Sequence, residues 1–343
     1  MSVGGWDIGG VNLKAVRVAG GTVAAVRSRP FELQRAPEAL VPLLRELARD
    51  LGLEGSDPQA VTMTAELSQL FRTKREGVAF VLDAVAAAFH EPLVHVLQVE
   101  GPFLPVAWAR ATPLAVAAAN WSATARLVGS HWPDALLIDV GSTTTDIIPI
   151  VAGQPAAIGR TDPERLRSGE LVYSGAVRTP VEGIASVVCV DGQASGVSAE
   201  GFALAGDVHL WRGDLAPDDY CVTPPDGRPA TRSHAGERLA RVICADRDML
   251  SDAGISGIAD SLAEAQIARM AASIVTVRRR HPALPHAVVT GLGEFLAARA
   301  AARAGLAVVS LAESLGRDAA RTAPAAAAAL LLERSLRPGG EAP

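Results

Sequence analysis

Two short stretches of the chain each place an aspartate at the mouth of a glycine turn. Residues 7–14 read DIGGVNLK and residues 139–146 read DVGSTTTD. Each follows an apolar run and leads into another, a pattern typical of a strand, a tight turn and a second strand. Glycine lets backbone N–H groups approach a phosphate, and aspartate supplies a hard oxygen ligand for Mg²⁺ or its bound waters. The two turns, 132 residues apart, therefore predict duplicated halves that face one cleft and bind a phosphate–metal pair.

A third stretch, residues 288–295, supports both turns. It reads VVTGLGEF, which is typical of a strand that delivers a glycine-rich turn to the start of a helix. Exposed N–H groups and the helix dipole at such a point suit an anion or a nucleotide. Gly291 and Gly293 are therefore candidate binding residues.

The composition excludes several classes of function. Of 343 residues, 49% are hydrophobic and 20% are charged, which is typical of a globular chain with a large core and two domains. The formal net charge of −5 and the lack of a basic block argue against nucleic acid as a partner. No basic leader opens the chain and no uncharged apolar run approaches about 20 residues, so we expect neither a signal peptide nor a membrane span.

Cysteine usage indicates a reducing compartment. Cys189, Cys221 and Cys244 are odd in number and show no CxxC spacing, which argues against a disulfide framework and against a zinc site. No His or acid stands at a suggestive spacing from them. We therefore expect all three thiols to lie in the core of a cytoplasmic protein.

The order of elements predicts an α/β chain of two lobes. Residues 1–134 read as an N-terminal lobe of three strands followed by alternating helices and strands, with a long helix over 112–128. Residues 135–343 read as a C-terminal lobe that ends with a helix over 319–334. Within it, residues 161–233 are rich in Gly, Pro, Asp and Arg, and we interpret this stretch as an inserted subdomain or substrate cover.

The order of the three motifs resembles the phosphate-one, phosphate-two and adenosine motifs of the sugar kinase/Hsp70/actin superfamily. The resemblance implies two ribonuclease-H-like lobes around a central cleft. The chain is more similar to the hydantoinase/oxoprolinase-like branch and, within it, to proteins linked to tetrahydromethanopterin-dependent one-carbon metabolism, which make methanofuran. The residues that carry this likeness are WDIGGVNLK at 6–14, TMTAEL at 62–67, AANW at 118–121, IDVGSTTTD at 138–146 and GDVH at 206–209.

The resemblance implies a condensation between small molecules. An aminomethyl-furanylmethyl diphosphate would react with the phenol of a γ-glutamyl-tyramine or tyrosine-like acceptor, giving an aryl ether and diphosphate, with Mg²⁺ as the cofactor. Neither nucleic acid nor a membrane takes part, and a homo-oligomer is left open. Two alternatives remain: an ATP-dependent small-molecule kinase or ATPase of the same superfamily, which alone would use ATP, and a nucleotide-binding regulatory or reactivase-like protein.

Under the transferase hypothesis, the turns hold the diphosphate as it leaves. Asp7 and Asp139 would hold Mg²⁺, and Lys14 would add a point charge. The turn residues that would contact the diphosphate are Gly9, Gly10, Asn12, Gly141, Ser142, Thr143 and Thr144. Further substrate-binding candidates are Lys74, Asn120, Arg178 and His209.

The acceptor phenol has a pKa near ~10, so a general base would help the reaction. Glu66 is the first candidate, followed by Asp146 and His209. Each has a plainer alternative: Glu66 caps the helix that follows, Asp146 holds a threonine of its turn in place, and His209 is a packed or solvated residue.

The other candidates also have two interpretations. Only two of the 32 basic residues are lysines, Lys14 and Lys74, which indicates roles that arginine does not serve, although drift gives the same pattern. Lys14 is alternatively an exposed strand residue, and Lys74 a solvated helix entrance. Asn120 faces either the substrate or a neighbouring helix, and Arg178 is a further basic group able to bind a diphosphate or a carboxylate.

Overall fold

The computed structural model describes residues 1–337, which form two compact lobes. The first lobe contains Met1–Ala135, Ile148–Asp162 and residues 310–337, and the second contains Leu136–Ile147 and Pro163–Val309. The expectation that residues 135–343 form one lobe differs from this division, because two later segments belong to the first lobe. None of the helices within residues 1–337 has the length and apolar character needed to span a bilayer.

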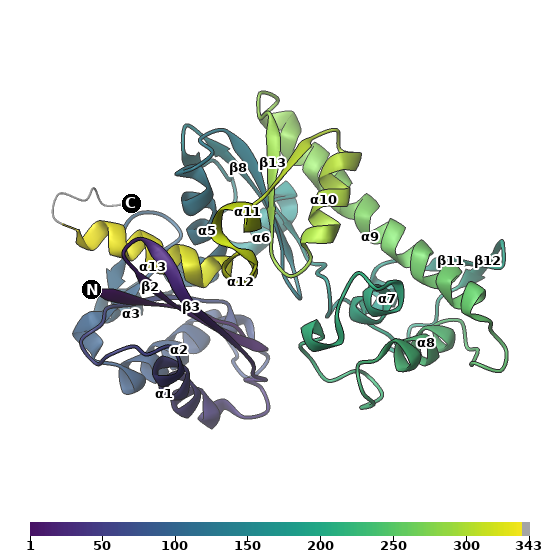
Figure 1. The fold of residues 1–343 in the computed structure, drawn as a ribbon, viewed down its shortest axis with the longest axis horizontal. Helices are drawn as coiled ribbons and strands as arrows, with labels where there is room; N and C mark the ends of the chain where they lie inside the picture. Colours follow the sequence, from purple (N-terminus) through teal and green to yellow (C-terminus); the bar gives the residue numbers. More distant parts are fainter. Residues whose placement is uncertain (338–343) are drawn as a thin grey trace. The chain divides into compact units, whose positions relative to one another are not determined.

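The C-terminal helix α13 (Ala323–Leu336) explains the difference. It packs on β1 (Ser2–Ile8) so closely that a Cβ added at Gly5 would lie 2.2 Å from the carbonyl oxygen of Ala325. Figure 1 shows α13, in yellow, beside the N-terminal strands. Its alanines are buried, since small side chains let a helix approach a sheet closely. The last helix of the chain therefore completes the core of the first lobe.

The first lobe is built on a six-stranded sheet with the order β3-β2-β1-β4-β5-β6. β1 pairs antiparallel with β2 and parallel with β4, and β2 pairs antiparallel with β3. This is the expected order of three strands followed by strands that alternate with helices. The remaining strands are β2 Asn12–Ala19, β3 Thr22–Pro30, β4 Gln59–Met63, β5 Val94–Val96 and β6 Leu104–Pro105.

Short helices connect and cover this sheet. They are α1 Leu40–Asp50, α2 Lys74–Ala88, α3 Val106–Ala111, α4 Pro113–Val116, α5 Asn120–Gly129, α11 Ala312–Leu315 and α12 Arg317–Arg321. The single helix expected over 112–128 is wrong, because α4 and α5 are separated at Ala118, whose φ is +51°. A left-handed residue cannot continue a right-handed helix.

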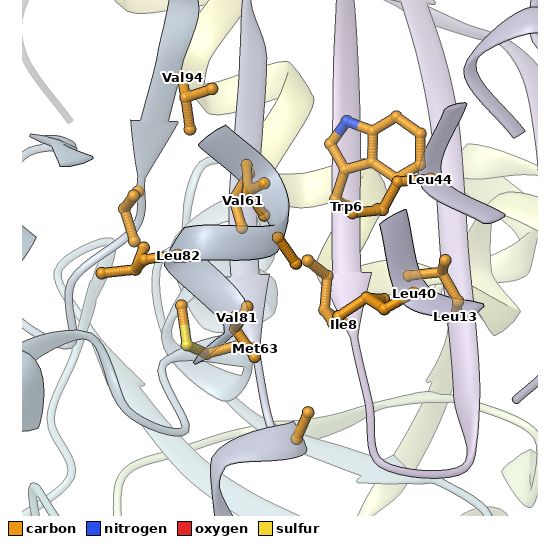
Figure 2. Packing of buried hydrophobic residues seen from close by; sticks show 14 of the residues in the cluster. Trp6, Ile8, Leu13, Leu40, Leu44, Val61, Met63, Val81, Leu82 and Val94 are labelled. Carbon is orange, nitrogen blue, oxygen red and sulfur yellow. The ribbon is translucent and has the colours of Figure 1, made fainter. Parts of the chain in front are cut away.

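The core of the first lobe lies between the sheet and helices α1 and α2 (Figure 2). Leu40 and Leu44 of α1 recur at helical spacing and are fully buried. Trp6 packs among them: its ring centroid lies 5.0 Å from that of Phe89, and its Nε1 donates a hydrogen bond to Gln59 at 2.8 Å. Trp6, one of the residues that carry the family resemblance, is therefore a core residue.

The second lobe is built on a sheet with the order β10-β8-β7-β13-β14. β13 is parallel to β7, and β10 is antiparallel to β8. The short strand β9 pairs with the end of β8, and both lie in the segment Ile148–Asp162 that the division assigns to the first lobe. The strands are β7 Ala135–Val140, β8 Thr145–Val151, β9 Gln154–Pro155, β10 Leu171–Val172, β13 His286–Thr290 and β14 Ala307–Ser310.

The two sheets repeat one local geometry around the aspartate–glycine turns. The Gly9 N–H donates to the carbonyl of Asn12 at 3.0 Å, and the Gly141 N–H donates to the carbonyl of Thr144 at 2.9 Å. The turn that the sequence predicts twice is therefore formed twice.

The next strand repeats its register as well. Thr62 of β4 pairs in parallel with Asp7, and Thr290 of β13 pairs in parallel with Asp139. In both sheets the first strand lies between the second strand and the fourth. This topology is ribonuclease-H-like in both lobes, and the predicted fold class is confirmed.

The inserted segment forms a small subdomain with its own core, which packs on the first half of the long helix α9 (Figure 1). That core runs from Val181 to Ala263, so it extends beyond the expected end near residue 233. The elements of this region and its neighbours are β11 Val187–Val190, β12 Gln193–Gly196, α6 Asp162–Ser168, α7 Ala205–Arg212, α8 Arg232–Arg241, α9 Asp252–Arg280 and α10 Glu294–Arg303.

The cysteines are not core residues. Cys189 and Cys244 are exposed, Cys221 is half-buried, and all three thiols are free. The two-stranded β11–β12 hairpin packs one face on α9 and leaves alternate residues to solvent, which places Cys189 outside. The expectation of three buried thiols is wrong.

Candidate functional site

The turn of the second lobe leaves its N–H groups open. The carbonyls of Gly141 and Ser142 accept hydrogen bonds from Ala176 and Arg178 at 2.9 and 2.8 Å. Within residues 1–337, the backbone N–H groups of residues 142–144 donate no hydrogen bond. Successive N–H groups of this kind form a concave site that suits an anion. Phosphate binding at this turn stays a prediction, and these N–H groups are the donors that it would use.

Arg178 brings positive charge to the same turn. Its side chain is exposed, and its Nη1 lies 3.4 Å from the Oγ1 of Thr143. A weak contact at this distance leaves most guanidinium donors available. The structure therefore brings Arg178 and the turn together, and its binding role stays a prediction.

A neighbouring segment, residues 174–179, fixes the shape of the turn. A Cβ added at Gly175 would lie 2.5 Å from the backbone nitrogen of Thr143, so only glycine fits there. The Gly175 N–H donates to the Oγ1 of Thr179 at 2.9 Å, and the Oγ1 of Thr145 donates to the carbonyl of Ser174 at 2.7 Å. Residues 174–179 pack so closely against the turn that any displacement of this segment would also move the turn.

Gln266 of α9 anchors that segment. Its Nε2 donates to the Oγ of Ser174 at 2.9 Å and to the carbonyl of Gly175 at 2.8 Å, and its Oε1 lies 2.9 Å from the Nε2 of His209. Since the amide nitrogen is used as a donor, the amide oxygen accepts, and this network assigns a proton to the Nε2 of His209.

His209 is a support for Gln266 and not a base or a substrate ligand. Its side chain is fully buried, and its ring meets that of Phe295 edge-on with centroids 4.9 Å apart. Both ring nitrogens face protein groups, since Nε2 is engaged by Gln266 and Nδ1 lies 3.9 Å from the Oδ2 of Asp214. The predictions of base and binding roles for His209 are therefore wrong, and its packed alternative is right.

The third motif packs against the second turn. Gly291 has φ +95°, and a Cβ there would lie 2.4 Å from the carbonyl oxygen of Val140 and 2.5 Å from the Oδ1 of Asp139. The Gly293 N–H donates to the carbonyl of Val140 at 2.8 Å. Close packing thus accounts for both glycines, and it holds the buried carboxyl of Asp139 in place.

Asp146 has an arginine partner. The Nη1 of Arg165 lies 2.5 Å from its Oδ1, and both side chains are buried. A carboxylate held in a short, buried ion pair is a poor proton acceptor, because protonation would leave the arginine charge uncompensated. The structure therefore favours a structural role for Asp146 over the predicted catalytic one.

In the first lobe, Lys14 faces Asp7 across the hairpin. The two residues are directly opposite in the register of β1 and β2, and the Nζ of Lys14 lies 3.6 Å from the Oδ2 of Asp7. The Oδ1 of Asp7 is buried and accepts no hydrogen bond from any residue that the structure describes. Burial raises the pKa of Asp7, and the Lys14 ammonium opposes this rise. Lys14 is thus a half-buried partner of the turn aspartate and not an exposed strand residue.

Glu66 is the most unusual carboxyl group of this lobe. It lies in the 3-10 turn η2 (Ala65–Leu67) and is 2% exposed, and neither of its carboxylate oxygens accepts a hydrogen bond within residues 1–337. A Cβ added at Gly77 of α2 would lie 2.5 Å from the Cα of Glu66, so the helix covers this turn closely. Burial raises the pKa of Glu66 to about 7, while the Lys74 ammonium lowers it.

Glu66 does not cap the helix that follows. α2 begins at Lys74, and its N-cap is Thr73, whose Oγ1 accepts a hydrogen bond from the Glu76 N–H at 3.2 Å. The carboxylate of Glu76 in turn accepts from the Arg72 N–H at 2.9 Å. The capping alternative for Glu66 is therefore wrong.

Lys74 lies between two carboxylates. Its Nζ is 2.6 Å from the Oδ2 of Asp162 and 3.8 Å from the Oε1 of Glu66. Both lysines of the chain thus sit beside acids of the first lobe, which favours function over drift. Lys74 is at the helix entrance as expected, but it is paired and not simply solvated.

The remaining candidates of the first lobe are simply placed. Gly9 and Gly10 form the tight part of the first turn, and Asn12 closes it through its carbonyl. A Cβ at Gly10 would meet no atom within 4 Å, so that position is open to a ligand. Asn120 is half-buried at the start of α5, and its role stays a prediction.

Three contributors were not predicted from the sequence. Gln266 had a usable signal, since it is polar at a position of α9 where helical spacing places buried apolar residues. Asp162 and Arg165 had none, because each makes its ion pair with a residue far away in the chain.

Two ribonuclease-H-like lobes, each with an aspartate–glycine turn, define a protein of the sugar kinase/Hsp70/actin fold class. Within that class, the hydantoinase/oxoprolinase family model matches residues 57–335, and the chain belongs to the hydantoinase/oxoprolinase family. It is 35% identical over 333 residues to the (4-{4-[2-(gamma-L-glutamylamino)ethyl]phenoxymethyl}furan-2-yl)methanamine synthase of Methanocaldococcus jannaschii, covering 97% of this chain and 98% of the relative. A relative of the same name from Methanococcus vannielii is 33% identical over 59% of this chain and 91% of its own length.

Similar solved structures are more distant. One is a PilM–PilN type IV pilus biogenesis complex, with 15% identity, coverage of 98% of this chain and 99% of that chain, and a TM-score of 0.49. Another is a ROK family glucokinase from Streptomyces griseus, with 13% identity, coverage of 96% and 98%, and a TM-score of 0.46. Likeness at this level carries no argument about activity.

Proposed function

We propose that the chain catalyses the ether-forming step of methanofuran biosynthesis. The substrates are an aminomethyl-furanylmethyl diphosphate and the phenol of a γ-glutamyl-tyramine acceptor. The products are the aryl ether that both relatives have in their names and diphosphate. Relatives named as synthases favour this reaction over the kinase and the regulator. On the structural side, the observation that carries the proposal is Glu66, a buried carboxyl with no hydrogen-bond partner among the described residues 1–337.

The reaction breaks one carbon–oxygen bond and forms another. The bond from the furanylmethyl carbon to the diphosphate breaks, and its electron pair leaves with the diphosphate. A lone pair of the phenol oxygen forms the new bond, and the phenolic proton passes to Glu66. The furan oxygen stabilises positive charge on the methylene carbon, so the protein needs to hold the leaving charge and remove one proton.

The second lobe has the groups that would hold the leaving charge. The open N–H groups of residues 142–144 point to an anion site, and Arg178 adds a cation beside it. Donors of this kind act most strongly where charge develops in the transition state. They are already fixed by the packed segment behind them, so little reorganisation is required.

The first lobe has the group that would take up the proton. With its pKa raised to about 7, Glu66 is a stronger proton acceptor than an ordinary glutamate and is still partly ionised near neutral pH. Because Glu66 is buried, water is kept from protonating its carboxylate before the phenol does. The neighbouring Lys14 and Lys74 offset part of the negative charge of Asp7 and Glu66.

Magnesium remains part of the proposal. The buried Oδ1 of Asp7, which accepts no hydrogen bond from the described residues, fits a hard cation or a water bound to it. Within residues 1–337 no three His, Cys, Asp or Glu side chains gather as a metal site, so oxygens of the diphosphate would complete the coordination. When bound, Mg²⁺ would neutralise charge on the leaving group, and Asp7 is the first-lobe carboxylate proposed to hold it. We place the reaction in the cytoplasm, where the exposed thiols of Cys189 and Cys244 stay reduced.

The test is direct. The purified protein is incubated with both substrates and Mg²⁺, without nucleotide, and the ether and diphosphate are measured by mass spectrometry and phosphate analysis. We expect equal amounts of both products, and loss of activity when EDTA removes the metal. Ether formation only with ATP, or ATP consumption without ether, would contradict the proposal.

A further inference from the structure

Asp162 and Glu66 compete for one ammonium group. The Lys74–Asp162 distance of 2.6 Å is that of a short, charge-assisted hydrogen bond, whereas the Lys74–Glu66 distance of 3.8 Å is too long for one. The side chain of Glu66 is 1% exposed, and that of Asp162 is 16% exposed. The lysine is therefore held by the more exposed of the two acids.

We propose that Asp162 is a positioning residue for the general base, because it keeps the Lys74 ammonium from closing on Glu66. This inference rests on the proposed role of Glu66. If Lys74 closed on Glu66, a direct ion pair would stabilise the carboxylate and make it a weaker proton acceptor. Asp162 leaves Lys74 near enough to keep Glu66 partly ionised and too far to bind it.

Four charged groups act on Glu66 or on its neighbours. Lys74 comes from α2, Asp162 from the start of α6 and Asp7 from β1, while Lys14 of β2 is paired with Asp7. Asp162 and Asp7 act on Glu66 in the direction opposite to Lys74. Loss of the Asp162 charge would remove one of the acids and free the lysine, so both consequences favour ionised Glu66.

The inference predicts opposite shifts in two variants. Asp162→Asn should lower the titration midpoint of Glu66 by about one pH unit, and Lys74→Met should raise it. Asp162→Glu keeps the charge and should stay near the wild type. The midpoint is measured by ¹³C-carboxyl NMR of the full-length protein with labelled glutamate, and the Glu66 signal is assigned by its loss in Glu66→Gln. The midpoint is then compared with the acidic limb of the pH profile of kcat/KM.

The outcomes separate the inference from the function beneath it. An unchanged or raised midpoint in Asp162→Asn overturns the inference, even if the enzyme works as proposed. A midpoint that moves while the acidic limb of kcat/KM stays fixed overturns Glu66 as the base, and with it the catalytic meaning of Asp162. A purely structural role for Asp162 would lower thermal stability without opposite shifts in the two variants.

Discussion

The two aspartate–glycine turns have the same geometry and different neighbours. Lys14 and Asp146 follow their turns at equivalent positions, 132 residues apart. In the first lobe this position holds Lys14, whose Nζ lies 3.6 Å from the Oδ2 of Asp7. In the second it carries an acid, which pairs with Arg165. The first turn therefore has two half-buried lysines beside its acids, whereas the second turn has an acid–arginine pair and backbone N–H groups that donate no hydrogen bond within residues 1–337.

The same contrast appears after the fourth strand of each sheet. Glu66 and Glu294 each lie four residues after a threonine that pairs with the turn aspartate. Glu66 is buried in η2, whereas Glu294 is half-buried as the first residue of α10. Under the proposed function, one scaffold would give a proton acceptor in one lobe and an anion site in the other.

The largest effect that this comparison predicts is on turnover. Glu66→Gln keeps the shape of the side chain and removes the base, so kcat should fall by roughly 10² to 10⁴. Glu294→Gln, the equivalent change in the second lobe, is the matched control and should stay within about threefold of the wild type. The measurement is steady-state ether formation. Equal losses of kcat in the two variants would contradict a functional difference between the lobes.

A second prediction concerns stability and its dependence on pH. The pKa of Glu66 is raised from 4.5 to about 7 in the folded chain, so the stability that protonated Glu66 contributes is present below pH 4.5 and is lost as the pH rises through 7. Glu66→Gln has no such loss. Its stability relative to the wild type should therefore increase by about 3 kcal/mol between about pH 4 and about pH 8.

Urea unfolding of both proteins at several pH values measures this change. A difference that stays constant with pH would mean that Glu66 titrates like an exposed glutamate.

Sequence reasoning succeeded where a signal is local. The turns, the strands beside them and the order of elements depend on neighbouring residues, and glycine, aspartate and apolar alternation reveal them. It failed where partners are distant in the chain: Arg165 for Asp146, Asp162 for Lys74, and α13 for the first sheet. The acids Glu66 and Asp146 are both buried, and the distant partner that each one finds decides whether it is an ion-pair partner, which no short motif encodes. For this reason Glu66 and Asp146 looked alike before folding.

A third prediction tests the anchoring of the second turn. Gln266→Leu would leave the Oγ of Ser174 and the Nε2 of His209 without their partner, and the segment behind the turn should shift. We expect KM for the diphosphate substrate to rise about tenfold, while KM for the phenol stays within about twofold. Gln193→Leu, on the exposed β12 strand, is the matched control. A parallel rise in both constants would indicate general loosening and not a specific role at the anion site.

The smallest effect is expected at the entrance of α2. Thr73→Ala removes the oxygen that accepts the Glu76 N–H and should cost about 1 kcal/mol of unfolding free energy. Lys74 is the first residue of that helix, so fraying of the helix end would also loosen the Lys74 ammonium between Asp162 and Glu66. The titration midpoint of Glu66 should then broaden or drift. Glu66→Gln should leave the cap intact, because Thr73 and not Glu66 forms it. At low pH Glu66 is protonated in the wild type, so Glu66→Gln should then cost little stability. A loss as large as that of Thr73→Ala would mean that Glu66 caps the helix after all, and it would weaken the case for Glu66 as the base.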